Sequence, residues 1–170
     1  MLICFLIAAA VIAADQGSKV LVMRGMAVGE SVDLIPGVFR FTYIRNPGAA
    51  FGMLSEHRWI FILLSAVAIV GVIVFVVLKK PKDKLLTVSL GRVLGGGIGN
   101  MIDRIFLGDV TDFLDFYLIP VWKWIFNVAD ACACVGAGLL MLYLIADTVR
   151  SEKEERAKKA QQSGEGENHE

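Results

Sequence analysis

The chain has 170 residues, which is enough for one domain of ordinary size. Its 17 basic and 17 acidic residues cancel to a formal net charge of zero, so bulk charge predicts no nucleic-acid partner. Hydrophobic residues make up 56% of the chain, against roughly 45–50% in soluble domains. This excess predicts a membrane protein. The three cysteines lie in apolar runs without a second cluster, so the sequence predicts neither a disulfide framework nor a metal site.

The segment 59–78 is the clearest candidate for a membrane-spanning helix. It contains no charged residue, and Lys79, Lys80 and Pro81 follow it. A bilayer core about 30 Å thick requires about 20 apolar helical residues, and basic residues commonly anchor the end of such a helix. The segment therefore predicts a complete span.

Three further spans are predicted over 2–23, 85–102 and 121–146, each with polar residues inside or at its ends. The first could also be the apolar core of a cleaved signal peptide, but it has no basic segment before it, and more apolar residues follow Asp15. We therefore interpret it as a retained helix. In the third, glycines at every fourth position predict a close approach of another helix, and Arg92 is interpreted as a side chain that extends toward the inner surface.

Lysines and arginines place both termini in the cytoplasm, because they concentrate between spans two and three and after span four. The segment 25–57 is then an outside domain. Within it residues 38–45 alternate apolar and polar side chains between two turn signals, which predicts a strand. The expected fold is an all-α polytopic membrane protein with four transmembrane helices and a small extracytoplasmic β-containing domain. Residues 1–150 form one integral-membrane domain, and 151–170 are expected to be a disordered cytoplasmic tail.

Several polar residues should converge near the outer boundary of the membrane. With a rise of about 1.5 Å per residue, Asp15 and Asp130 lie about 20–25 Å from the cytoplasmic ends of their helices. Structural ion pairs, Asp15 with Lys19 or Asp103 with Arg104, would explain part of this pattern. Asp112 and Asp130 differ, because neither has a basic residue three or four positions away. Two carboxylates that face each other share one proton, and such a pair can act as general acid and general base.

Five stretches of the sequence resemble the lipoprotein signal peptidases, or signal peptidase II, of bacterial inner membranes. They follow the order found in that family and lie between residues 1 and about 147. The stretches are DQGSK at 15–19, NPGAAFG at 46–52, GGGIGNMIDR at 95–104, VTDF at 110–113 and FNVAD at 126–130.

The resemblance implies a membrane aspartic endopeptidase that cleaves diacylglyceryl-modified prolipoproteins before the lipidated cysteine. Asp112 and Asp130 would be the catalytic residues, and the mechanism would require neither a metal nor another cofactor. The expected partners are the lipidated substrate and membrane lipid but no nucleic acid, and a monomer is expected. The supporting or substrate-binding positions would be Asp15, Lys19, Asn46, Asn100, Asp103, Arg104 and Asn127.

Two other functions fit parts of the sequence. A small proton-coupled carrier or channel would use membrane carboxylates as a relay, but the inner half of the spans offers only Arg92 and no acidic residue before Asp147. A structural scaffold that packs through the glycines of span three would leave the paired aspartates unexplained. We favour the peptidase interpretation over both, mainly because of the resemblance.

Overall fold

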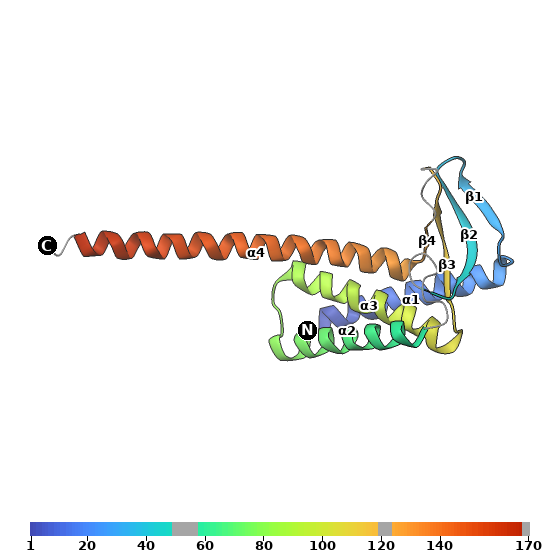
Figure 1. The fold of residues 1–170 in the computed structure, drawn as a ribbon, viewed down its shortest axis with the longest axis horizontal. Helices are drawn as coiled ribbons and strands as arrows, with labels where there is room; N and C mark the ends of the chain where they lie inside the picture. The colour runs from blue at the N-terminus through green and yellow to red at the C-terminus, as the bar shows by residue number, and fades with distance from the viewer. Residues whose placement is uncertain (49–57, 119–123, 168–170) are drawn as a thin grey trace.

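The computed structural model describes residues 1–48, 58–118 and 124–167, and these ranges contain four helices and four strands (Figure 1). The helices run nearly side by side, and the strands form a sheet that stands across one end of them. Both chain termini lie at the opposite end. The elements in chain order are α1 (Leu2–Gly25), β1 (Ser31–Ile35), β2 (Phe39–Asn46), α2 (Arg58–Lys79), α3 (Lys84–Phe106), β3 (Val110–Phe116), β4 (Ile125–Phe126) and α4 (Val128–Glu167).

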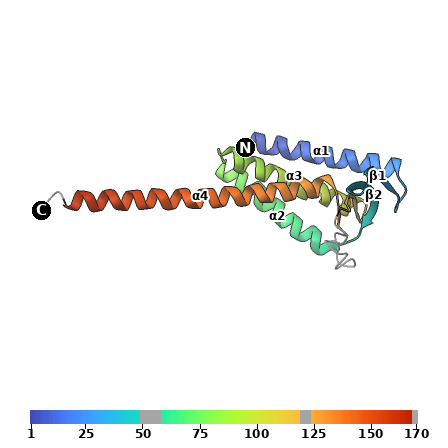
Figure 2. The same ribbon diagram turned by 90° about the horizontal axis from the view of Figure 1, so that it is seen from above.

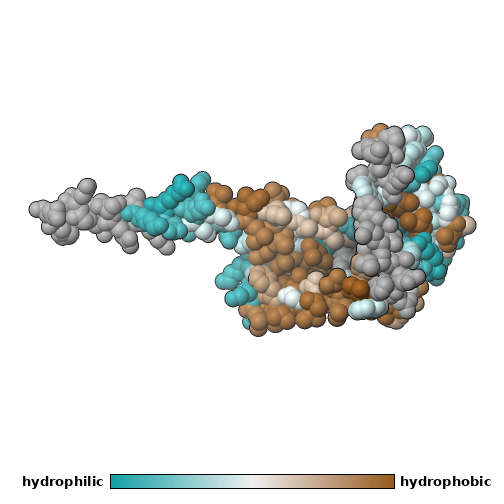
Figure 3. All heavy atoms as spheres, in the orientation of Figure 1, coloured by the Kyte–Doolittle hydropathy of each residue, from teal (hydrophilic) through white to brown (hydrophobic). Residues whose placement is uncertain are grey.

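Each of the four helices is long and apolar enough to cross a membrane. On the face seen in Figure 3, apolar side chains cover the helices, whereas polar side chains gather on the projecting part of α4 and are mixed with apolar ones on the sheet. The large apolar residues of α2 are mostly exposed, as expected for a surface that faces lipid rather than water. The predicted fold class, four membrane helices with a small sheet, is confirmed.

Helix α3 lies at the centre of the bundle and contacts the other three helices (Figure 2). Its glycines allow this close packing. A Cβ atom on Gly91 or Gly95 would lie 2.8 Å from a backbone oxygen of α1, and one on Gly96 would collide with the backbone oxygen of Ala129 in α4. Small residues at such positions bring helix backbones together in membranes. These three glycines therefore fix where α1 and α4 lie against α3.

The short link between α2 and α3 contains residues that end α2 and residues that begin α3. Lys80 adopts a left-handed conformation with φ 45°, and its N–H donates to the carbonyl of Val76 at 3.0 Å, as in a helix C-cap. Pro81 follows. The Asp83 side chain then accepts a hydrogen bond from the Leu86 N–H at 2.9 Å and caps α3.

The sheet is antiparallel in the order β1-β2-β3-β4. The strand predicted over 38–45 is present as β2. A second strand, β3, which was not predicted from the sequence, lies between the third and fourth spans and pairs with β2. The register shifts between Phe41 and Ile44, so two residues of β2 lie opposite one residue of β3. Beyond this bulge, Asn46 pairs with Val110, two positions before Asp112 in β3.

Helix α4 differs from the prediction at both ends. The fourth span was predicted to begin at residue 121, but α4 begins at Val128, because β4 precedes it and Asn127 caps it. Residues 119–123 lie outside the described residues. At the other end α4 continues to Glu167, where we expected disorder. The segment after 150 is rich in strong helix formers, and ion pairs one turn apart, Arg150 with Glu154 and Glu155 with Lys159, stabilise it.

Candidate active site

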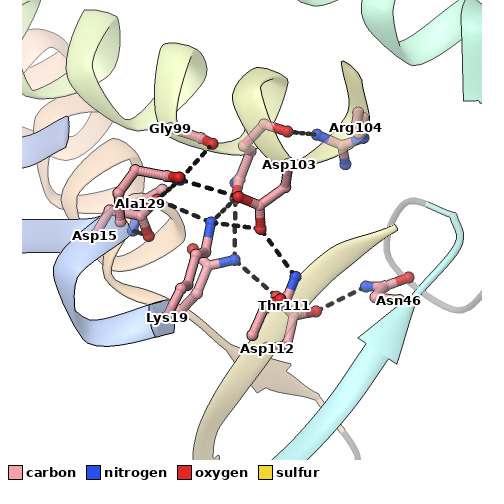
Figure 4. Close-up of polar contacts among 12 residues, drawn as sticks. Asp15, Lys19, Asn46, Gly99, Asp103, Arg104, Thr111, Asp112 and Ala129 are labelled. Atoms are coloured by element: carbon pink, nitrogen blue, oxygen red, sulfur yellow. Dashed lines mark hydrogen bonds and ion pairs between the residues drawn. The ribbon is translucent and has the colours of Figure 1, made fainter. Parts of the chain in front are cut away.

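Asp112 and Asp130 are called here the aspartate pair. Asp112 lies where the sheet meets the ends of the helices (Figure 4). Asp112 belongs to β3 and Asp130 to the first turn of α4. Asn127 touches both: its side-chain Nδ2 donates to Oδ1 of Asp112 at 2.7 Å, and its backbone N–H donates to Oδ2 of Asp130 at 3.3 Å. The two carboxylates therefore flank a single buried asparagine.

The capping of α4 places Asp130. The Asn127 Oδ1 atom accepts a hydrogen bond from the Asp130 N–H at 2.8 Å, so the two residues form a reciprocal capping box. The N–H of Ala129, also in the first turn, has no acceptor within the helix. It donates to Oδ1 of Asp15 in α1 at 2.9 Å. The local chemistry that starts the helix thus also holds Asp130 beside Asp112.

Asp112 is 2% exposed, and this burial dominates its acid–base behaviour. The pKa of Asp112 is raised to about 7. Burial is the largest cause and the charge of Asp130 adds to it, while hydrogen bonds from Asn46 and Asn127 act in the opposite direction. Asn46 Nδ2 donates to Asp112 Oδ2 at 2.9 Å, and Asn46 Oδ1 accepts from the Gly48 N–H at 3.1 Å. A carboxyl group that titrates near neutral pH is suited to general acid–base catalysis.

Lys19 of α1 is a buried lysine with two carboxylate partners. Its Nζ lies 2.8 Å from Asp15 Oδ2 and 3.0 Å from Asp103 Oδ2, and all three side chains are at most 1% exposed. A buried charge requires such partners because removal from water is costly. The backbone N–H of Thr111 also donates to Asp103 at 3.0 Å, which ties the start of β3 to α3.

Asn100 of α3 connects this ion cluster to the aspartate pair. Its Oδ1 accepts from Lys19 Nζ at 3.1 Å and from Asn127 Nδ2 at 3.0 Å, and its Nδ2 donates to Asp130 Oδ1 at 2.6 Å. Arg104 lies at the edge and donates to the backbone oxygen of Asn100 at 3.4 Å.

All nine residues selected from the sequence are joined in this polar network. The ion-pair interpretation is correct for Lys19 with Asp15. Among the described ion pairs, however, the cation beside Asp103 is Lys19 and not Arg104.

Sequence reasoning assigned no role to Gln16, although it lies in the first family-like stretch. Its Nε2 donates to Asp15 Oδ2 at 3.1 Å, to Asp103 Oδ1 at 2.9 Å and to the backbone oxygen of Gly99 at 3.1 Å. Its position beside Asp15, in a polar stretch inside an otherwise apolar helix, was the available signal. For metals, no cluster of three or more His, Cys, Asp or Glu side chains suited to hold an ion occurs in the described part of the chain.

Comparison with known proteins gives a consistent result. The family model described as signal peptidase (SPase) II matches residues 7–146. The lipoprotein signal peptidase of Halalkalibacterium halodurans is 40% identical over 156 residues, which cover 92% of this chain and 100% of the relative. That of Brevibacillus brevis is 46% identical over 143 residues, which cover 84% and 95%.

Solved structures agree with the sequence relatives. A bacterial membrane enzyme determined by the in meso method at 2.3 Å resolution matches with a TM-score of 0.80 and 31% identity, over 85% of this chain and 88% of that one. A second, at 1.9 Å resolution, matches with a TM-score of 0.77 and 30% identity, over 85% and 93%. With a matched family model, relatives of nearly equal length and the same membrane fold, the chain belongs to the signal peptidase II family of lipoprotein signal peptidases, multi-pass proteases of bacterial membranes.

Proposed function

We propose that the chain is an aspartic endopeptidase that cleaves a diacylglyceryl-modified prolipoprotein immediately before its lipidated cysteine. The observation that carries the proposal is the placement of Asp112 and Asp130 on either side of Asn127. One aspartate takes a proton from the attacking water. The other, protonated, stabilises the oxyanion that develops on the scissile carbonyl, and a proton then reaches the leaving amine. These steps need no metal or other cofactor.

The remaining residues of the polar network have supporting roles in this proposal. Lys19, Asp15 and Asp103 hold the ends of α1 and α3 together, and Asn100 and Asn127 orient the carboxylates. Asn46 and Arg104 lie at the edge of the network, and in this proposal they contact the substrate. Residues 1–150 make up the peptidase domain, and the protein acts as a monomer in contact with membrane lipid.

The proposed site lies near the outer face of the cytoplasmic membrane, with both termini in the cytoplasm. The support is the excess of lysine and arginine at the end of the bundle away from the sheet. In this position the acyl chains of a lipidated substrate remain in the outer leaflet while its scissile bond reaches Asp112. A proton relay across the membrane would need ionisable groups along the whole path, which the inner half does not offer.

We expect Asp112→Asn and Asp130→Asn each to reduce cleavage of a lipidated precursor by at least about 10³-fold, because each removes one member of a general acid–base pair. Cleavage is followed by gel mobility with purified enzyme in detergent. Asp109→Asn and Asp147→Asn are matched controls, because Asp109 directly precedes β3, Asp147 lies on α4, and both residues are outside the polar network; both variants should retain activity.

Normal cleavage by either pair variant would refute the assignment of the aspartate pair. The same assay with an unlipidated precursor tests the substrate. We expect cleavage only of the lipidated form, and equal rates on both forms would contradict the lipid-dependent part of the proposal.

A further inference from the structure

Lys19 makes one contact beyond those that its charge requires. The buried ammonium group already has two carboxylate partners, Asp15 and Asp103, at 2.8 and 3.0 Å. Its third contact goes to a neutral group, Oδ1 of Asn100 at 3.1 Å. Lysine has three donors and no acceptor, so this contact decides which end of the Asn100 amide faces it.

The Asn100 amide therefore has one allowed orientation. If it were turned over, its NH₂ group would face the Lys19 ammonium and the Asn127 NH₂ group, and its oxygen would face a carboxylate oxygen of Asp130. Each of these contacts would pair donor with donor or acceptor with acceptor. In the observed orientation the Asn100 NH₂ group donates to Asp130 Oδ1 at 2.6 Å.

Two hydrogen bonds and the position of Asp130 in its helix favour its carboxylate form. Its Oδ1 accepts from Asn100, and its Oδ2 accepts from the Asn127 backbone N–H. It also lies in the first turn of α4, where the partial positive charge of a helix N-terminus stabilises an anion. Asp112 lies on a strand, is 2% exposed and accepts its side-chain hydrogen bonds from two amides, those of Asn46 and Asn127.

We propose that Lys19 is a positioning residue: through Asn100 it holds Asp130 as the carboxylate that receives the water proton, and the proton of the pair remains on Asp112. This inference rests on the proposed peptidase function and assigns the two roles that the proposal leaves open. The charged groups that act on the pair are Asp15 and Lys19 from α1 and Arg104 from α3, and Asp103 lies behind them as a partner of Lys19.

The proton balance of the reaction follows. The water oxygen bonds to the scissile carbonyl carbon while one water proton moves to Asp130, and protonated Asp112 donates a hydrogen bond to the carbonyl oxygen. When the tetrahedral species collapses, the C–N bond breaks and the proton on Asp130 passes to the leaving nitrogen. Asp130 is again a carboxylate and Asp112 is again protonated, with one water consumed.

The first test locates the proton without substrate. In protein labelled with carbon-13 in its aspartate carboxyls, the infrared C=O band of a protonated acid is measured at pH 6 for wild type, Asp112→Asn and Asp130→Asn. We expect the band in wild type and Asp130→Asn and its loss in Asp112→Asn. Loss in Asp130→Asn with retention in Asp112→Asn would overturn the assignment.

The second test asks whether Lys19 acts through Asn100. We expect Lys19→Met and Asn100→Ala each to lower kcat about 10²-fold or more with KM nearly unchanged, since they weaken general base catalysis. The acidic limb of the pH–rate profile should move to higher pH, and the double variant should be no slower than the slower single variant. Arg24→Met, an exposed basic residue of the same helix, is the control.

Multiplicative effects of the two substitutions, or a loss of kcat without movement of the acidic limb, would overturn the role of Lys19. If Lys19→Met does not fold, Asn100→Ala still tests the shift of the limb, because it keeps the ion cluster intact. If the proposed peptidase function is wrong, the wild-type enzyme does not cleave the precursor. If only the role of Lys19 is wrong, the wild-type enzyme cleaves the precursor but the variants do not behave as expected.

Discussion

Gly99 lies where any side chain would meet the buried ion cluster. A Cβ atom at this position would be 2.6 Å from Asp15 Oδ2 and 3.2 Å from the Cβ of Ala129. Asp15 cannot withdraw without losing contacts to Lys19 and to the Ala129 N–H. We expect Gly99→Ala to destabilise the protein by about 1–3 kcal/mol, the usual cost of overpacking, and to reduce cleavage strongly.

The matched control for this prediction is Gly97→Ala on the same helix. A Cβ atom there would lie 3.4 Å from Ile69, an apolar side chain that can adjust. Since alanine is favoured over glycine within a helix by roughly 0.5–1 kcal/mol, this variant should be as stable as wild type or slightly more so. Thermal unfolding in detergent and the cleavage assay measure both variants, and equal behaviour of the two would contradict the packing argument.

The raised pKa of Asp112 predicts the alkaline side of the activity profile. If protonated Asp112 stabilises the oxyanion, kcat/KM should fall as the pH rises above about 7, where this group loses its proton. The measurement is the pH dependence of precursor cleavage in a buffer series of constant ionic strength. Constant activity from pH 6 to 9 would show that protonated Asp112 is not required.

The raised pKa of Asp112 also makes the stability of the folded protein fall as the pH rises. The folded protein keeps the Asp112 proton up to about pH 7, whereas the unfolded chain releases it near the ordinary value of 3.8. Between these values the folded state binds more protons, so this group's contribution to stability is lost as pH rises through the window. Asp112→Asn should show a weaker loss of thermal stability between pH 5 and pH 8 than wild type.

At the N-terminus of α4, Asn127 has two roles: it caps the helix, and in the proposed mechanism it orients the aspartate pair. Its Oδ1 caps the helix, and its Nδ2 contacts Asp112 and Asn100. Serine caps helices about as well as asparagine but has no amide to bridge the two partners. We therefore expect Asn127→Ser to keep nearly wild-type thermal stability and lose most of its cleavage activity.

Asn127→Ala is the comparison, because it removes both the cap and the bridge. It should lose a further 1 kcal/mol or so of stability, the typical value of an N-cap. Comparable activity of wild type and Asn127→Ser would mean that capping, and not the bridge to Asp112, is the contribution of this residue.

The sequence predicted elements well where burial in lipid determines them. The helix at 59–78 was placed within a residue at each end, because an uncharged run followed by Lys79 and Pro81 has few alternatives. Prediction was weaker at the polar end of the bundle. Strand β3 was missed, since Asp112 and Asp115 interrupt its apolar pattern and their partners, Asn46, Arg40 and Thr42, come from a distant strand.

The composition of the site was predictable, but its connections were not. The family-like stretches singled out all nine residues, whereas the double pairing of Lys19 depends on how closely α1 approaches α3. That approach is set by Gly91 and Gly95, whose contacts are more than 80 positions away in the chain. Residue spacing within one helix could suggest the ion pair of Lys19 with Asp15, but it could not suggest the ion pair of Lys19 with Asp103 on another helix.

At the scale of the whole molecule, the apolar band over the helices and the sheet at one end give the protein a defined direction across the membrane (Figures 1 and 3). Helix α4 is longer than a bilayer core requires, since its 40 residues at about 1.5 Å each span about 60 Å. Its charged part therefore extends away from the membrane on the side opposite the sheet.

This geometry makes the proposed orientation testable with single cysteines. After Cys4, Cys132 and Cys134 are replaced by alanine, a cysteine is introduced either at Val28, exposed beside the sheet, or at Ser151, exposed on the extension of α4. Because basic residues gather at the α4 side, we expect a membrane-impermeant maleimide to label Val28→Cys in intact spheroplasts and Ser151→Cys only after lysis. The reverse pattern would invert the orientation and place Asp112 and Asp130 at the cytoplasmic face, where a substrate lipidated in the outer leaflet could not reach them.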